Sequence, residues 1–598
     1  MQTNTPGVEP QISQMTQING GKEERSRIRF FGYICAHLRY LRFQGLEGSL
    51  VAAAPRCEIF RLAAASLVLL FPAIASAANS GQLPPGVIRV DDVGRAANAA
   101  RVASDAPITL DGTRQLFLDD YLIGRADNLR RITQQARKFS GNPVVWDAGA
   151  GGDVTYGSVL QDQGRFRMWY ARGRMVAYAE SADGLRWSMP NLDFVRIDGE
   201  KTNVLFASDR RNIGNQAKLK YEGPEIVHFS QLSGVMRTRE SDTARRYLMG
   251  FISIEVNYTG PRPSPHHRGE RRGFGVAASP DGLRWTLLDN WATETFVDGP
   301  TYWLLDPKLD RYVQYGRALF VTPEATRAWG LDGMPTVPMT PAEHAYLKIR
   351  ARGRAVSRAE SPDLVSWEIL DAGKSPLVLT HDPFDPPGAE MYAMQVFAYQ
   401  GLYIGMIKVW QSGLEHTGPF EVQLAVSRDG HQFNRVGFRT PFIAEGDVSE
   451  WDRFNVSTFM NDPILVGDEM RIFYSAQSHR HAPYRGKDFG EMGAGVGYAT
   501  IQRDRFVSLE ASFDGGTLVT KPLRIAGRSL RLNAKSDYGS IVIEALNSAG
   551  TVVATSKPWR RDSLDGAVEW ETGALPASEP VALRFTLKNA KLFAVWSS

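Results

Sequence analysis

Five acidic residues each precede a short apolar run that is typical of a β-strand; they are Asp153, Glu225, Asp298, Glu390 and Asp462. A carboxylic acid that protonates a leaving oxygen, together with a carboxylate that activates water or attacks carbon, cleaves glycosidic bonds. Single acidic residues before strands are usually turn formers or exposed charges, so this chemistry needs a fold that gathers them. We expect Asp153, Glu225, Asp298 and Glu390 to be the catalytic candidates.

Aromatic and basic side chains in the same regions are suited to binding a sugar. C–H groups on a sugar face can stack against aromatic rings, and Arg or His can bind hydroxyls or an acidic substituent. We therefore expect a substrate-binding set that consists of Tyr156, Arg317, Tyr392, Trp410 and His416. Trp146 is a further stacking candidate, and the alternative for each ring is that it fills the protein core.

A pattern built on Ser-x-Asp recurs along the chain. Four copies occupy residues 181–187, 279–285, 361–367 and 427–433, and a shorter fifth copy occupies 502–506. We expect the Asp to accept backbone hydrogen bonds in a tight turn, the following Gly to supply a positive φ, and the Trp to pack on the strands. The Asp residues of these turns are therefore expected to be structural.

Repeats of this size predict one supersecondary unit copied around an axis. A four-stranded unit with a tight turn between its third and fourth strands is typical of a propeller blade, so we expect an all-β fold with five blades. The strand nearest the axis should begin each blade, at residues 156–161, 225–229, 301–305, 392–397 and 462–466. An isolated strand at 115–123 is expected to complete the last blade.

The sequence pattern changes after residue 512. Short alternating runs continue without the Ser-x-Asp motif, which is typical of a small β-sandwich. The expected organisation is a leader at 1–77, a linker at 78–110, a five-bladed β-propeller at 111–512 and a C-terminal β-sandwich at 513–598.

Residues 61–77 have the features of a secretory signal peptide. Arg56 and Arg61 precede an apolar stretch, and an Ala-Ser-Ala triplet that ends at Ala77 forms a small-x-small cleavage site. The stretch is shorter than the roughly 20 apolar residues that span a membrane. We expect translation to begin near Val51, export after cleavage near Ala77, and no membrane span.

The composition gives no support for nucleic acid or an anionic membrane as a partner, because the formal net charge is only +4 over 598 residues. Both cysteines, Cys35 and Cys57, precede the expected cleavage point, so the mature chain would lack disulfides, catalytic thiolates and Cys-based zinc sites. His479 and His481 have no matching carboxylate spacing for a metal. We expect neither a metal nor a cofactor.

Several segments resemble exported bacterial proteins of the glycoside hydrolase family 32-like group; they are QLFLDDYLIGR at 115–125, FRMWYA at 166–171, YAESADGLRW at 178–187, WLLDPKLDRYVQYGR at 303–317 and MQVFAYQGLYIGM at 394–406. The resemblance implies a five-bladed propeller, a following β-sandwich and glycosidase activity. The chain lacks the RDP motif of family 32 enzymes, and its MNDP string, at 460–463, lies in the last expected blade. Only the three-carboxylate plan is carried over, which five-bladed families acting on arabinans, xylans and galactans share.

The sequence therefore predicts an exported glycosidase that cleaves a plant, algal or microbial poly- or oligosaccharide with carboxylates in a central pocket. Two alternatives stay open. A non-catalytic glycan-binding propeller would need the aromatic rings but no close pair of carboxyls. A glycoside phosphorylase would need Arg, Lys or His beside the acid to hold phosphate.

Overall fold

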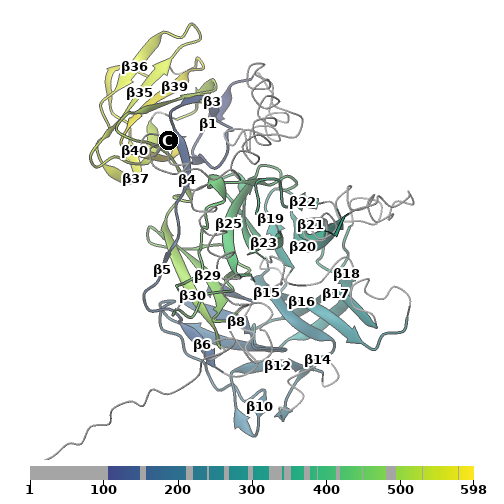
Figure 1. The fold of residues 1–598 in the computed structure, drawn as a ribbon. Coiled ribbons are helices and arrows are strands. Elements are labelled where there is room, and N and C mark those ends of the chain that lie inside the picture. The colour runs from purple at the N-terminus through teal and green to yellow at the C-terminus, as the bar shows by residue number, and fades with distance from the viewer. Residues whose placement is uncertain are drawn as a thin grey trace, which may run out of the picture. The chain divides into compact units, whose positions relative to one another are not determined.

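The computed structural model describes residues 106–148, 156–209, 220–238, 242–260, 269–293, 299, 301–321, 340–341, 352–368, 377–386, 388–411, 418–447, 449–479, 493–527, 529–576 and 578–598. The chain divides into two compact units, Met1–Val87 and Ile88–Ser598, and every described residue lies in the second. Regular structure in this part is nearly all β-strand (Figure 1), and it includes a short 3-10 turn, η3, at Gly437–Arg439. The expected all-β fold class is confirmed. Of the helical residues described, none forms a segment long and apolar enough to cross a membrane.

Five sheets, antiparallel except for one short edge pair, follow one another along the chain, and we number them first to fifth. The first sheet contains β7 (Gly157–Asp162), β8 (Arg165–Ala171), β9 (Met175–Ser181), β12 (Val204–Ser208) and, at its outer edge, β14 (Glu225–Ile226). The second contains β15 (Phe229–Arg237), β16 (Tyr247–Val256), β17 (Glu270–Ser279) and β18 (Thr286–Thr293). The third contains β19 (Tyr302–Asp306), β20 (Arg311–Val321), β21 (Arg352–Ser361) and β22 (Leu377–Leu379).

The last two of these sheets keep the same strand order. The fourth contains β23 (Ala389–Tyr399), β24 (Leu402–Gln411), β25 (Phe420–Ser427) and β26 (Asn434–Arg435). The fifth contains β27 (Ser457–Thr458), β28 (Ile464–Val466), β29 (Glu469–Gln477) and β30 (Gly493–Gln502), and is completed by β5 (Arg137–Lys138) and β6 (Val145–Ala148). The fifth sheet is therefore assembled from two segments that lie far apart in the sequence.

The first strands of the five sheets lie together, and we call them the inner strands. Strand β15 lies between β7 and β19, and β19 lies beside β23. The connection from β27 to β28 contacts the inner strands of the first and fourth sheets. Met460 N donates to Gly157 O of β7 at 2.8 Å, and Gln395 Nε2 of β23 donates to Asn461 O at 3.0 Å. The inner strands of the fourth, fifth and first sheets are thereby joined.

Two strand predictions are wrong. Segment 115–123 does not complete the last sheet, because β2 (Gln115–Leu116) pairs with the C-terminal strand β40 and the closing strands are β5 and β6. The second inner strand does not begin at Glu225, since β14 pairs in parallel with β12 of the first sheet and β15 begins at Phe229. Glu225 therefore lies on an outer edge strand.

The Ser-x-Asp segments form the tight turns that the sequence predicts. In the first turn, Asp183 Oδ1 accepts from Leu185 N at 2.8 Å and Arg186 N at 2.9 Å, and Ser181 Oγ accepts from Gly184 N at 2.9 Å. These backbone donors lower the pKa of Asp183 to about 2. Gly184 has a φ of 73°. The Asp serves to hold the turn, which leaves it no catalytic role.

Each of these turns contacts the preceding sheet, and the contacts continue around the whole set. Trp169 Nε1 of the first sheet donates to Gly282 O of the second turn at 2.6 Å, and Phe274 of the second sheet meets Trp367 of the third turn edge-on, with ring centres 5.8 Å apart. The Tyr315 hydroxyl of the third sheet donates to Gly430 O of the fourth turn at 3.0 Å, and the Tyr399 hydroxyl of the fourth sheet donates to Asp504 Oδ1 of the fifth turn at 2.6 Å. Arg471 Nη1 of the fifth sheet donates to Asp183 O of the first turn at 2.6 Å. The last contact runs from the fifth sheet to the turn of the first. The array of sheets is therefore closed on itself.

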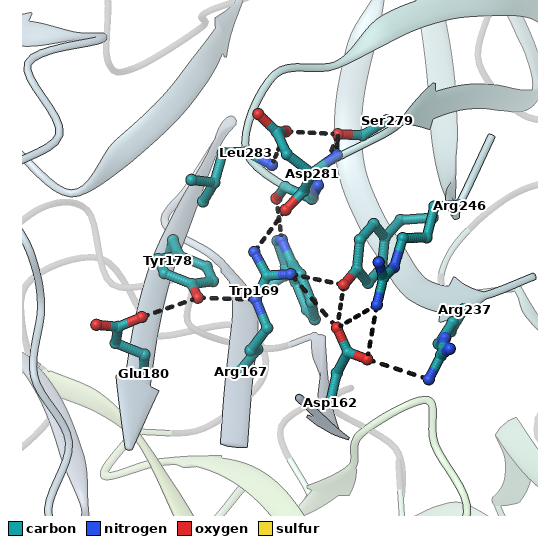
Figure 2. Close-up of polar contacts among 12 residues, drawn as sticks. Asp162, Arg167, Trp169, Tyr178, Glu180, Arg237, Arg246, Ser279, Asp281 and Leu283 are labelled. Carbon is teal, nitrogen blue, oxygen red and sulfur yellow. Dashed lines mark hydrogen bonds and ion pairs between the residues drawn. The ribbon is translucent and has the colours of Figure 1, made fainter. Parts of the chain in front are cut away.

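The junction between the first and second sheets is also fixed by charge (Figure 2). Asp162, whose carboxylate is almost fully buried, pairs with Arg237 at 3.1 Å and Arg246 at 3.2 Å and accepts the Tyr247 hydroxyl. Burial works against ionisation, but the Tyr247 hydroxyl and the Arg246 guanidinium together hold the pKa of Asp162 below its ordinary value. The carboxylate is thus compensated where it lies between sheets.

Beyond the fifth sheet, two six-stranded sheets bury a common core. One contains β4 (Arg130–Thr133), β31 (Val507–Ala511), β34 (Leu530–Lys535), β37 (Asp562–Ala567) and β40 (Ala590–Ser597), with β2 paired to β40. The other contains β3 (Ile123–Asp127), β32 (Gly516–Thr520), β35 (Ser540–Leu546), β36 (Val552–Ser556), β38 (Trp570–Gly573) and β39 (Ala582–Lys588). Leu532 of β34 and Phe585 of β39, which belong to different sheets of this pair, share this core.

Two small sheets complete the described strands. Strands β10 (Arg196–Ile197), β11 (Glu200–Lys201) and β13 (Tyr221–Glu222) form one of them. Strand β1 (Ile108–Leu110) pairs in parallel with β33 (Leu523–Ile525). Strands β1 to β4 thus all pair with strands of the C-terminal region rather than with the five sheets.

The turn-to-sheet contact can be tested with one alanine substitution. Gly282 has a φ of 76°, and a Cβ there would lie 2.8 Å from Trp169 Cζ2, closer than van der Waals packing permits. Gly164→Ala is the matched control, since Gly164 has a φ of 74° and nothing lies within 4 Å of its Cβ position. We expect Gly282→Ala to lower the free energy of unfolding by about 1–3 kcal/mol more than Gly164→Ala, measured by urea denaturation. Equal losses would show that this contact does not stabilise the array.

Candidate functional site

A cluster of charged and aromatic side chains lies where the inner strands of the third and fourth sheets begin. Glu390 and Tyr392 are near the start of β23, and antiparallel pairing places Trp410 of β24 directly opposite Glu390. From the third sheet, β20 contributes Arg317 and β21 contributes Arg354. We call this group the Glu390 cluster; with Lys408, Phe420 and Tyr156, described below, it draws on three sheets.

The Glu390 carboxylate is bound through one oxygen. Arg354 donates twice to Glu390 Oε2, from its backbone N at 3.1 Å and from its guanidinium Nη1 at 2.8 Å. Within the described part of the chain, no donor is seen on Oε1. Glu390 is largely buried, with 8% of its surface exposed. The ion pair therefore fixes the orientation of the carboxylate.

The Tyr392 ring is surrounded by three cations. The Arg317 guanidinium carbon lies 3.7 Å from the ring centre, the Arg354 carbon lies 5.3 Å away and Lys408 Nζ lies 5.1 Å away. Arg317 also donates from Nε to Tyr392 O at 2.9 Å, and both Arg317 and Lys408 are buried. Cation–π attraction offsets part of the cost of burying these charges.

The aromatic residues support the charged groups from within the core. Trp410 stacks on Phe420 with ring centres 5.5 Å apart, and Tyr392 meets both rings edge-on, at 5.7 Å from Trp410 and 4.8 Å from Phe420. Trp410 is only 1% exposed. The Trp410 ring therefore packs in the core, which is the alternative to sugar stacking that the sequence left open. It has no free face on which a sugar could stack.

Tyr156 connects the first sheet to the cluster. Lys408 Nζ lies 5.6 Å from the centre of the Tyr156 ring and 4.4 Å from that of Phe420. The structure thus brings together five residues of the predicted catalytic and binding sets, which are Tyr156, Arg317, Glu390, Tyr392 and Trp410.

Three other predicted residues, Asp153, Asp298 and His416, lie outside the described residues. Gly299, the residue after Asp298, is described. A Cβ on Gly299 would overlap the Arg317 guanidinium. This close approach puts the chain at residue 299 against the Glu390 cluster. The catalytic parts of Asp153 and Asp298 stay predictions.

Glu225 is not part of the cluster. It is exposed on the outer strand β14, where its Oε1 accepts the Tyr221 hydroxyl at 2.8 Å. The sequence prediction placed it at the start of an inner strand, and the register that the structure shows removes that reason for a catalytic role.

Two residues of the cluster, Lys408 and Arg354, were not predicted from the sequence. Lys408 is the one charge in the strand LYIGMIKVW, and a lone charge in an apolar strand signals a buried polar function. Arg354 stands among several arginines at 350–358, so no feature of the sequence separates it from its neighbours.

Asp462 is set apart from Glu390 but is itself unusual. It lies between β27 and β28. Thr458 pairs with Tyr474 of β29 and Ile464 pairs with Arg471. Five residues thus lie between the two paired positions on this side and only two on β29, so the segment bulges out. This bulge carries the segment toward the other inner strands. Its neighbour Asn461 meets β23 at Gln395, about 15 Å along the strand from Glu390.

Solvent reaches Asp462, yet burial raises the pKa of its carboxyl to about 6. The residue as a whole is exposed, while protein atoms crowd around its carboxyl group and disfavour the charged form. Among the described residues no hydrogen bond or ion pair to its side-chain oxygens is found. Elsewhere in the described ranges, no three His, Cys, Asp or Glu side chains gather closely enough to hold a metal ion.

No protein-family model and no curated protein sequence matches this chain. Several glycoside hydrolases are among the similar solved structures. A thermostable family-43 glycoside hydrolase has a TM-score of 0.35 and 12% identity, over 63% of this chain and 96% of that one. The family 32 β-fructofuranosidase of Bombyx mori has a TM-score of 0.34 and 9% identity, over 79% and 93%. A family 43 arabinoxylan arabinofuranohydrolase from Bacillus subtilis has a TM-score of 0.31 and 12% identity, over 78% and 99%. At these scores no activity or residue is transferred to this chain, and membership of family 32 is not established.

The pKa of Asp462 predicts a pH-dependent stability. A raised pKa means that the native state keeps a proton that the unfolded chain releases above about pH 4, so native stability falls as pH rises from about 4 to 6 and then levels. The Asp462→Asn variant lacks this pH-dependent contribution to stability. We expect its urea midpoint, relative to that of the wild type, to increase across this window. A constant difference between Asp462→Asn and wild type from pH 4 to 7 would contradict the raised pKa.

Proposed function

We propose that this chain is an exported glycoside hydrolase, built on a five-bladed β-propeller followed by a β-sandwich, that cleaves a poly- or oligosaccharide. The closed order of turn-to-sheet contacts supports the propeller, and the core shared by two sheets supports the sandwich. The signal-peptide pattern in the sequence at residues 61–77 supports export, and N-terminal sequencing of the secreted protein would test cleavage near Ala77.

The observation that carries the proposal is the oriented carboxylate of Glu390. It lies at the N-terminal end of an inner strand, bound through one oxygen by Arg354 and surrounded by aromatic and cationic side chains. A carboxylate held by a cation suits the part of base or nucleophile, both of which act as anions. Asp298 or Asp153 then supplies the acid that protonates the leaving oxygen.

Glu390→Gln tests this role. The amide keeps the shape of the side chain but cannot act as base or nucleophile, so we expect turnover to fall at least about a thousandfold in a variant that still folds. Its thermal midpoint should fall as well, because the Arg354 ion pair is lost. The assay is product analysis after incubation with arabino-, xylo-, galacto- and fructo-oligosaccharides and with algal oligosaccharides. Glu225→Gln is the control, and we expect it to keep wild-type activity. A fully active Glu390→Gln variant would remove Glu390 from the mechanism.

A glycoside phosphorylase is a second candidate, because the structure places cations beside the carboxylate. Arg354 contacts Glu390, and Arg317 and Lys408 lie around the adjacent Tyr392 ring. Such groups can hold a phosphate oxyanion. Formation of a sugar 1-phosphate that depends on inorganic phosphate, followed by ³¹P NMR, would favour this reaction. Cleavage at the same rate without phosphate would favour hydrolysis, and binding without cleavage would favour a glycan-binding propeller.

A further inference from the structure

Trp146 differs from the aromatic residues of the Glu390 cluster because it is exposed. It lies on β6, the strand that completes the fifth sheet, and 38% of its surface is accessible to solvent. The Tyr156, Tyr392 and Trp410 rings are almost fully buried by comparison. A tryptophan left open to solvent is the largest apolar side chain that a protein can offer to a ligand.

The strand beside Trp146 is adapted to its ring. Strand β30 begins GAGVG, and Trp146 pairs with Gly495 in register. A Cβ on Gly493 would overlap the indole, and a Cβ on Gly495 would lie 3.0 Å from Trp146 Cε3. Glycine at these two positions therefore lets the ring rest against the bare backbone of β30, which any larger residue would prevent.

Neighbouring rings hold the indole in place. Trp451 meets Trp146 edge-on, with ring centres 6.4 Å apart and an interplanar angle of 89°. Trp451 in turn stacks on Tyr474 at 5.7 Å, and the Tyr474 hydroxyl donates to Asp452 Oδ2 at 2.9 Å. Because the ring is already fixed, little side-chain entropy would be lost when a ligand binds to it.

Trp146 lies at the same end of the sheets as Glu390. Alternate strands of an antiparallel sheet run the same way, so β30, the third strand of the fifth sheet, runs parallel to the inner strand of that sheet. Gly493 and Gly495 are at the N-terminal end of β30, and Glu390 is at the N-terminal end of the inner strand β23. In a closed ring of such sheets these ends share one face.

We propose that Trp146 is a sugar-stacking platform that binds an outlying unit of the same saccharide chain whose scissile bond is cleaved at Glu390. This inference rests on the proposed function. One face of a pyranose or furanose presents C–H groups that pack against the indole π-face. No hydrogen bond among the described residues uses the Trp146 indole N–H. That N–H is a donor for a sugar hydroxyl beside the stacked face. The ligand is thus a saccharide of several units, longer than the cleavage site alone requires.

The test compares chain lengths. Wild type, Trp146→Ala and Trp146→Phe are assayed on two- to six-unit series of arabino-, xylo- and galacto-oligosaccharides. We expect Trp146→Ala to raise KM about tenfold for the longest oligomers that the wild type cleaves, with kcat and the KM of the dimer unchanged, and Trp146→Phe to keep most of the affinity. A tenfold change corresponds to about 1.4 kcal/mol. Tyr538→Ala, which removes an exposed ring from the C-terminal region, is the matched control and should change neither value.

A second variant acts through the strand beneath the ring. Gly493→Ala displaces the indole without removing it, and we expect the same rise in KM for long oligomers as in Trp146→Ala. An unchanged KM in both variants at every length would overturn the platform. So would a shift from dimer to monomer in Trp146→Ala by analytical ultracentrifugation, because the ring would then be covered by a second copy of the chain.

Equilibrium binding separates this inference from the proposed function. If the wild type cleaves none of the oligomers, isothermal titration with the six-unit members is measured for wild type and Trp146→Ala. Binding that is lost only in Trp146→Ala would support the platform although the hydrolase proposal had failed. Cleavage that is length-independent and identical in the two proteins would overturn the platform while the hydrolase proposal stood.

Discussion

The structure depends on one repeated contact, in which a Ser-x-Asp turn of one sheet meets the strands of the sheet before it. The turn is rigid because Asp and Ser satisfy its backbone donors and, in three copies, Gly takes a positive φ. Its outward carbonyls then accept from Trp169, Tyr315 and Arg471 of the preceding sheets. Each sheet is thereby positioned by the next, and the inner strands are brought together as a result.

Much of the fold could be read from the sequence because the repeat is local. The turns at 181–187, 279–285, 361–367 and 427–433 formed as expected. Pairing between distant segments was harder to predict. The strands that close the fifth sheet are short and polar in part, and nothing local distinguishes β5 from the longer run at 115–123 that pairs elsewhere.

The same limit applies to the candidate site. Glu390 and Tyr392 were identified because they stand near the start of an expected inner strand, and Arg317 was identified as a basic side chain that could bind hydroxyls. The structure joins all three. Glu225 was misassigned by four residues of register, since the inner strand begins at Phe229. Arg354 could not be singled out among its neighbouring arginines, because its importance comes from a pairing across two sheets that no spacing in the sequence expresses.

The fifth sheet joins β5 and β6, near residue 140, to β30, which ends at residue 502. Strands β1 to β4 likewise pair with strands that lie beyond residue 506. Neither the ring nor the C-terminal core can be completed before almost the whole polypeptide has been synthesised. Closure of the fifth sheet and completion of the C-terminal core are therefore late events in synthesis, and cutting the chain back from the N-terminus past residue 148 should remove pairing partners from both regions.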